Sequence, residues 1–75
     1  MTLDQVPIGH KASIRAIVAD PALTQRLMEM GMLEGDTIEM LAVAPLGDPL
    51  ELRVGDYRLS LRRAEASRVE VDLLP

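Results

Sequence analysis

The amino-acid sequence predicts a mainly β fold, a small and partly closed β-barrel of about five short strands with one inserted amphipathic helix. Apolar and polar residues alternate with a period of two in several short runs, a pattern typical of strands with one buried face. Tight turn sequences separate these runs, and only one stretch has helical spacing. A chain of 75 residues buries about 60% of its unfolded surface, so we expect one simple domain over residues 1–75.

The first strand is expected at residues 11–18, after a short lead-in and a turn at 7–9. In the lead-in, Leu3 and Val6 are expected to pack against the rest of the domain. The alternation predicts one face of the strand that points inward, made of Ala12, Ile14, Ala16 and Val18. The opposite face then comprises Lys11, Ser13, Arg15 and Ile17.

The helix is expected at residues 21–30. Asp20 can cap its first free N–H groups, and Pro21 suits the first helical position, where a missing donor costs nothing. An apolar stripe follows at helical spacing, formed by Leu23, Leu27 and Met30, while Gln25, Arg26 and Glu29 face away. Gly31 then supplies the left-handed residue that ends a helix. A helix this short is marginal alone, so its stripe must dock on the sheet.

The next strand, residues 37–44, is nearly apolar on both faces and should therefore be central in the sheet. We expect the barrel interior on one face and the helix on the other. The inward set is Ile38, Met40, Ala42 and Ala44, and the other face carries Leu41 and Val43.

A β-hairpin is predicted from residues 50–54 and 57–61, joined by Gly55 and Asp56. A two-residue link of this type favours a primed turn and fixes the register. The inward pairs are then Val54/Tyr57, Leu52/Leu59 and Leu50/Leu61, and the outward pairs are Arg53/Arg58 and Glu51/Ser60. A single helical turn at 63–66 and a short strand at 69–72, where Val69 and Val71 alternate with Glu70 and Asp72, complete the chain.

Composition excludes several classes of function. The chain has no cysteine, so it has no disulfide, Cys-type zinc site, iron–sulfur cluster or thiol nucleophile. Its one aromatic residue, Tyr57, cannot form a base-stacking platform or a proline-reading groove. The net charge of −4 disfavours nucleic acid as a partner. The apolar stretches are too short for a membrane span and the N-terminus lacks a signal-peptide pattern, so we expect a cytoplasmic protein without membrane insertion.

No catalytic, cofactor or metal site is predicted. The serines lack a nucleophile-elbow sequence and the glycines are scattered singly, which leaves neither a nucleophile nor a phosphate loop. The thioethers of Met28, Met30 and Met32 suit Cu(I) rather than Fe(II), and core packing is the simpler interpretation. His10 is expected to be a solvated turn residue. We therefore expect no enzyme and no cofactor.

The outward arginines are the most informative polar feature. Like charges that face each other on a hairpin repel, so the Arg53/Arg58 pair carries a small local cost. Arg62 continues the same face, and Arg63 follows it. In one interpretation these arginines form a docking surface for an acidic partner or a phosphate. In the other, Glu51 and further acids neutralise them across the sheet.

Three motifs together resemble the ferrous iron transport protein A (FeoA) family. They are Gln25-Arg26-Leu27-Met28-Glu29-Met30-Gly31-Met32-x-x-Gly35, then Ala44-Pro45-Leu46-Gly47-Asp48-Pro49, then Tyr57-Arg58-Leu59-Ser60-Leu61-Arg62 with a following Glu65-Ala66. The similarity runs from Thr2 to Val71. It implies an SH3-like β-barrel with a helix inserted after the first strand.

The resemblance also implies an accessory role in bacterial Fe(II) uptake. FeoA-like proteins are cytosolic partners of FeoB, a membrane permease with a cytosolic GTP-binding domain, and are proposed to affect transport or nucleotide turnover. The family is also described as binding transition metal ions. This chain, with no cysteine and one histidine, offers no convincing ligand set.

The loop at residues 45–49 is a candidate anchor for a partner. Pro45 and Pro49 stiffen it, Gly47 lets the chain turn, and Leu46 is apolar at its tip. Alternatively, Leu46 folds back and plugs one end of the barrel.

The leading hypothesis is a non-enzymatic adaptor that docks on the GTP-binding part of a FeoB-like permease. Its partner-binding residues would be Leu46, Gly47, Asp48, Pro49, Arg53, Arg58 and Arg62. The alternatives are a small module that binds or senses a transition metal, and an SH3-like domain that binds peptides by strand addition. Self-association through the outward Leu33, Leu41 or Val43 is left open.

Overall fold

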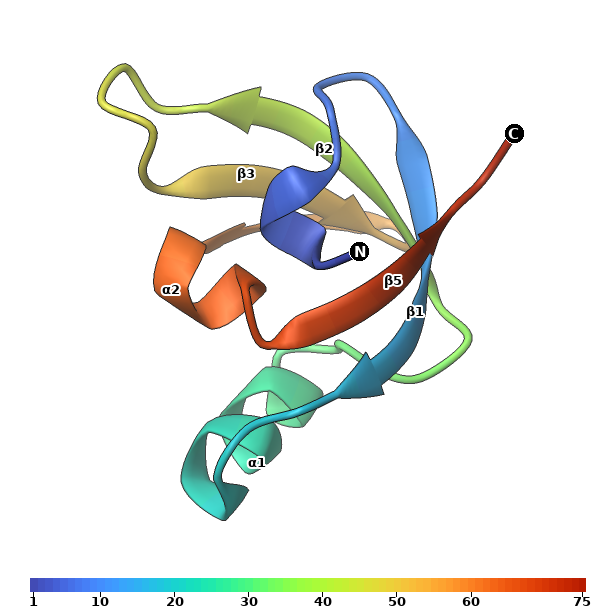
Figure 1. Cartoon of the computed structure of the whole chain (residues 1–75), viewed down its shortest axis with the longest axis vertical. Helices are drawn as coiled ribbons and strands as arrows, with labels where there is room; N and C mark the ends of the chain where they lie inside the picture. The colour runs from blue at the N-terminus through green and yellow to red at the C-terminus, as the bar shows by residue number, and fades with distance from the viewer.

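Five antiparallel strands form one sheet that curls around the core, in the order β4-β3-β2-β1-β5 (Figure 1). The computed structural model describes residues 1–75. In chain order the elements are a 3-10 turn, η1 (Leu3–Gln5), then β1 (Lys11–Ile17), α1 (Pro21–Glu29), β2 (Thr37–Val43), β3 (Leu50–Val54), β4 (Tyr57–Leu61), α2 (Arg63–Ala66) and β5 (Val69–Leu73). The two edge strands do not pair with each other, so the prediction of a mainly β, partly closed barrel is confirmed. No helix is both long enough and apolar enough to cross a membrane.

The core is aliphatic and draws on every strand. Leu3 and Val6 are buried in it, as predicted for the lead-in. Leu27 of α1 and Met32 just after α1 are fully buried in the same cluster. The remaining members are Ala12, Ile14, Ile38, Met40, Leu50, Leu52, Val54, Leu61, Ala66, Val69 and Val71.

The start of α1 is as predicted, but its position is not. Asp20 Oδ1 accepts a hydrogen bond from the Leu23 backbone N–H at 2.8 Å, and Pro21 is the first helical residue. The last helical residue is Glu29, and Gly31 has the expected left-handed φ of +97°. The helix lies at one end of the barrel, beyond the end of β1, rather than over the outer face of β2 (Figure 1). The expectation that it covers β2 was wrong, because the buried Leu27 docks into the barrel end instead.

Two β-bulges reverse the predicted inward and outward faces in the second halves of β1 and β2. The register of β1 with β5 shifts between Ile14 and Ala16, and that of β2 with β3 shifts between Met40 and Ala42. Each bulge inserts one extra residue and turns the following side chains over. The predictions there were therefore wrong: Ile17 and Val43 pack against the core, whereas Val18 is 56% exposed. The alanines predicted to point inward beyond the bulges, Ala16, Ala42 and Ala44, are only half-buried.

The β3–β4 hairpin has the predicted register at all five pairs, from Val54/Tyr57 to Leu50/Leu61. Gly55 has a φ of +58° and Asp56 does not have a positive φ, which is the pattern of a type II′ turn. Tyr57 departs from its expected inward position. The residue is 46% exposed, and its hydroxyl donates to the Met30 carbonyl oxygen at 2.8 Å, which connects β4 to the end of α1.

Candidate partner-binding surface

The β2–β3 loop presents one large hydrophobic side chain, Leu46, to solvent. The Gly47 N–H donates to the Ala44 carbonyl oxygen at 2.7 Å, and the Ala44 N–H donates to the Pro49 carbonyl oxygen at 3.0 Å. Gly47 has a φ of +88°, which requires glycine for an unstrained turn. Leu46, at the tip, is 98% exposed. The alternative in which Leu46 plugs the barrel is therefore wrong.

Arg63 fastens this loop to the rest of the protein, a role that the sequence did not reveal. Its Nε donates to the Gly47 carbonyl oxygen at 2.9 Å, and its backbone N–H donates to Asp48 Oδ1 at 2.8 Å. Its Nη1 also reaches the carbonyl oxygen of Asp4 at 3.1 Å. In Figure 1, α2 begins beside the loop that leaves β2. Arg63 therefore holds the loop in place, and its side chain does not join Arg53, Arg58 and Arg62, which together form the arginine surface of the hairpin.

Three arginines share the outer surface of the hairpin. Arg53 and Arg58 are direct cross-strand partners, and alternation places Arg62 on the same side as Arg58. Arg53 Nη1 lies 3.5 Å from Glu39 Oε1 on β2, so the neutralising acid is Glu39 rather than Glu51. Neither Arg58 nor Arg62 is in a salt bridge, since the three bridges in the molecule involve other arginines. The arginine surface is therefore only partly neutralised.

The structure brings the loop and the arginine surface together. Asp48, Pro49 and Arg62 line one shallow depression, so five predicted positions, Leu46, Gly47, Asp48, Pro49 and Arg62, form a continuous region. Arg53 and Arg58 extend it along the hairpin. This region combines an exposed leucine with unpaired cations, a composition suited to protein recognition.

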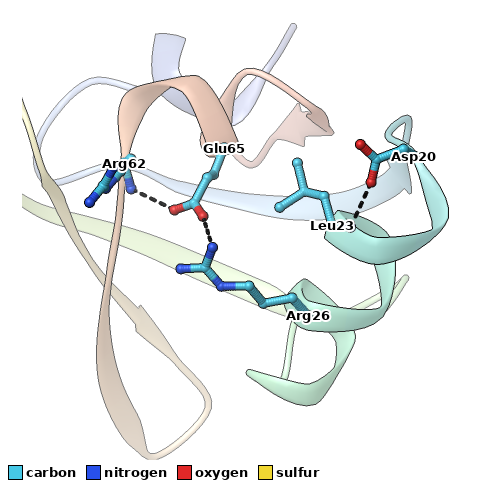
Figure 2. A network of polar contacts seen from close by, with 5 residues as sticks. All are labelled: Asp20, Leu23, Arg26, Arg62 and Glu65. Carbon is cyan, nitrogen blue, oxygen red and sulfur yellow. Dashed lines mark hydrogen bonds and ion pairs between the residues drawn. The ribbon is translucent and has the colours of Figure 1, made fainter.

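A buried carboxylate, Glu65, holds the backbone of Arg62, the residue at the end of the arginine surface. Its Oε1 accepts from the Arg62 backbone N–H at 3.0 Å, and its Oε2 lies 2.6 Å from Arg26 Nη1 (Figure 2). The Glu65 side chain is only 11% exposed. Arg26 is exposed on α1, as predicted, but its guanidinium also reaches from α1 to α2 to pair with this carboxylate, a contact that the sequence did not reveal. With Glu65 engaged, the Arg62 side chain is left to solvent.

The residues considered as metal ligands do not form a cluster. His10 is exposed, Met32 is fully buried and Met28 is half-exposed. No three or more His, Cys, Asp or Glu side chains lie close enough to hold an ion together.

Comparison with known proteins decides the family. The FeoA domain family matches residues 1–73. The chain belongs to the FeoA domain family. The resemblance seen in the sequence is confirmed.

Solved FeoA structures share the fold. An FeoA-like protein of Clostridium acetobutylicum is 36% identical, with a TM-score of 0.93 over 100% of this chain and 87% of that one. FeoA of Stenotrophomonas maltophilia, described as an SH3 domain protein complexed with zinc, is 38% identical, with a TM-score of 0.84 over 96% and 89% of the two chains. The SH3-like fold class is thereby confirmed.

A curated relative links the domain to a transporter. The chain is 38% identical over 74 residues to a fusion of Fe(2+) transport protein A with the Fe(2+) transporter FeoB from Porphyromonas gingivalis. The match covers 99% of this chain and 9% of the fusion protein. In that relative, the FeoA domain and the transporter are parts of one polypeptide.

Proposed function

We propose that this protein is a non-enzymatic, cytoplasmic accessory protein of bacterial ferrous iron uptake. It docks on the cytosolic GTP-binding part of a FeoB-type permease and modulates transport. The fusion of an FeoA domain to FeoB in the Porphyromonas gingivalis relative carries the proposal, because domains joined in one polypeptide often act together. Ferrous iron is the cargo of the permease in this account.

The docking surface is the loop together with the arginine surface. Leu46 supplies an exposed apolar anchor on a loop that Arg63 holds in place, so little ordering is needed on binding. Arg58 and Arg62 supply positive charge on a protein of net charge −4, which would orient an acidic partner towards this one side.

Binding of the isolated GTP-binding domain of the permease tests the proposal. We expect measurable affinity by calorimetry, and a loss of about tenfold or more for Leu46→Asp and for Arg53→Glu/Arg58→Glu. Val18→Asp is the control for the first variant, because Val18 is an exposed apolar residue next to α1. Arg15→Glu/Arg68→Glu is the control for the second, since it changes the net charge equally. Parent-like binding by both test variants would contradict the assignment of the surface.

A second candidate function is the binding of a transition metal, favoured by the zinc complex of the Stenotrophomonas maltophilia relative. Anaerobic calorimetry with Fe(II), Mn(II) and Zn(II) tests it. His10→Ala is the informative variant, because His10 is the one imidazole of the chain. Affinity that does not change in this variant would argue against a histidine site.

A further inference from the structure

Strand β4 forms one edge of the sheet: it pairs with β3 on one side, and no other segment of the chain pairs with its other side. It is the outermost strand beside β3. The other edge, β5, is partly covered by the N-terminus, since the Val71 N–H donates to the Met1 carbonyl oxygen at 2.9 Å and Thr2 bridges to Glu70. No backbone hydrogen bond outside the β3–β4 ladder involves any residue of β4.

The hairpin register determines which backbone groups of β4 are free. In a hairpin with a two-residue turn, the residues that flank the turn form a hydrogen-bonded pair, and such pairs recur at every second position. Here these are Tyr57, Leu59 and Leu61. Arg58 and Ser60 therefore direct their N–H and C=O groups away from β3. They present an unused hydrogen-bonding edge to solvent.

A row of charges across the sheet ends at this edge with a cation. Register places Lys11 beside Glu39, Glu39 beside Arg53, and Arg53 beside Arg58. Glu39 Oε1 lies 3.5 Å from Arg53 Nη1, whereas the last member of the row, Arg58, is in no salt bridge. Arg53 and Arg58 are adjacent cations in this row, so a carboxylate at the next position would give Arg58 the oppositely charged neighbour that it lacks.

We infer that β4 accepts an extended acidic segment of another protein as a sixth strand of the sheet. The segment pairs with the free groups of Arg58 and Ser60 and places an Asp or Glu opposite Arg58. Alternation puts the side chains two and four residues along on the same face, opposite Ser60 and Arg62, so a second acidic side chain can face Arg62. The side chains opposite Leu59 and Leu61 face the side of Leu59, which is half-buried and packed against the core, so apolar residues suit those two positions.

Charge distinguishes this occupant from the β4 strand of a second copy of the protein. The sequence of β4, Tyr57–Leu61, contains no acidic residue, so a second copy of this edge offers no carboxylate to Arg58. The β5 edge of a second copy does carry Glu70 and Asp72, but its own N-terminus already pairs with Glu70 and Val71. The inference rests on the proposed function for the biological source of the segment, because β4 carries part of the same arginine surface. It adds the mode of binding, which is strand addition.

A capped synthetic peptide of about eight residues, with glutamate and valine alternating, tests the inference without the permease. In nuclear magnetic resonance experiments on the intact protein, we expect the amide protons of Arg58 and Ser60 to exchange at least about fivefold more slowly when the peptide is bound. A peptide with lysine at the glutamate positions should bind at least about fivefold more weakly. Unchanged exchange at both amides would overturn strand addition, whatever the permease domain does.

Two substitutions separate backbone pairing from charge. Ser60→Pro removes an outward N–H that the fold does not use, and proline is tolerated at such edge positions. It should reduce peptide binding about tenfold or more, whereas Ser60→Ala should not. Arg58→Glu should reverse the preference towards the lysine peptide, a result that does not depend on tolerance of proline. Equal binding of both peptides by Arg58→Glu would contradict the pairing at this position.

Discussion

Arg63 at the start of α2 donates from Nε to the carbonyl oxygen of Gly47 at 2.9 Å, so α2 holds the loop that exposes Leu46. The same guanidinium also bonds the Asp4 carbonyl oxygen, which connects the loop to η1. Surface loops are ordinarily mobile, but here the Arg63 side chain restrains the loop through its hydrogen bond to Gly47. Leu46 is therefore exposed on a loop whose conformation is restrained.

Replacing Arg63 should loosen the loop and leave the barrel folded. Arg63→Ala removes the two side-chain bonds, and we expect a loss of about 1–3 kcal/mol in the free energy of unfolding. Amide exchange at Gly47 should accelerate more than exchange in the centre of β2. Arg63→Lys keeps the charge but cannot reach both carbonyl oxygens in the same way, so it should resemble the alanine variant. Unchanged exchange at Gly47 would show that the loop is held by other contacts.

Leu46→Asp should leave stability intact. Since the side chain is 98% exposed, the free energy of unfolding should change by no more than about 0.5 kcal/mol. Chemical denaturation of the parent and the variant provides the comparison. A loss several times larger would mean that Leu46 packs against the protein in solution.

The Arg26–Glu65 pair should be energetically coupled. Arg26→Ala leaves the 11%-exposed carboxylate of Glu65 with only the Arg62 N–H, and we expect a destabilisation of about 1–3 kcal/mol. Adding Glu65→Leu should recover part of that loss, because an apolar replacement removes the unpaired charge. A double-mutant cycle measures the coupling. Additive effects of the two substitutions would show that the ion pair does not form in solution.

Gly31 is expected to be less replaceable than Gly35. Both have a left-handed φ, of +97° and +89°, so alanine is strained at either position by about 1–2 kcal/mol. A Cβ atom at Gly31 would also overlap the Tyr57 hydroxyl, whereas a Cβ atom at Gly35 would meet nothing. Gly31→Ala should therefore be destabilising by about a further 1–3 kcal/mol, as measured by thermal or chemical unfolding. Equal costs at the two positions would contradict the packing of Tyr57 against Gly31.

Local patterns in the sequence predicted the features that depend on neighbouring residues. The cap at Asp20 and the turn at Gly55 each follow from a few adjacent residues, and both were predicted correctly. The bulges at Arg15 and Leu41 were not, because alternation continues through them in the sequence and only pairing with another strand reveals the extra residue.

The candidate surface was predicted in part. Arg53 and Arg58 share a face because the turn fixes the register, which sequence reasoning can establish. The roles of Arg63 and Arg26 depend on contacts with residues far away in the chain, and no local pattern signals them. From the sequence alone, an arginine at the start of a helical turn could equally have a solvated side chain that bonds nothing.

The most direct test of the account is a map of the surface that the permease domain covers. Backbone amide resonances of the protein are followed by nuclear magnetic resonance as the GTP-binding domain is added. We predict that shifts and line broadening concentrate at residues 45–49 and at Arg58 and Arg62, and that they are smaller in α1, which lies at the opposite end of the molecule from the loop in Figure 1. Changes centred on α1, with the loop and the arginine surface unperturbed, would contradict the account.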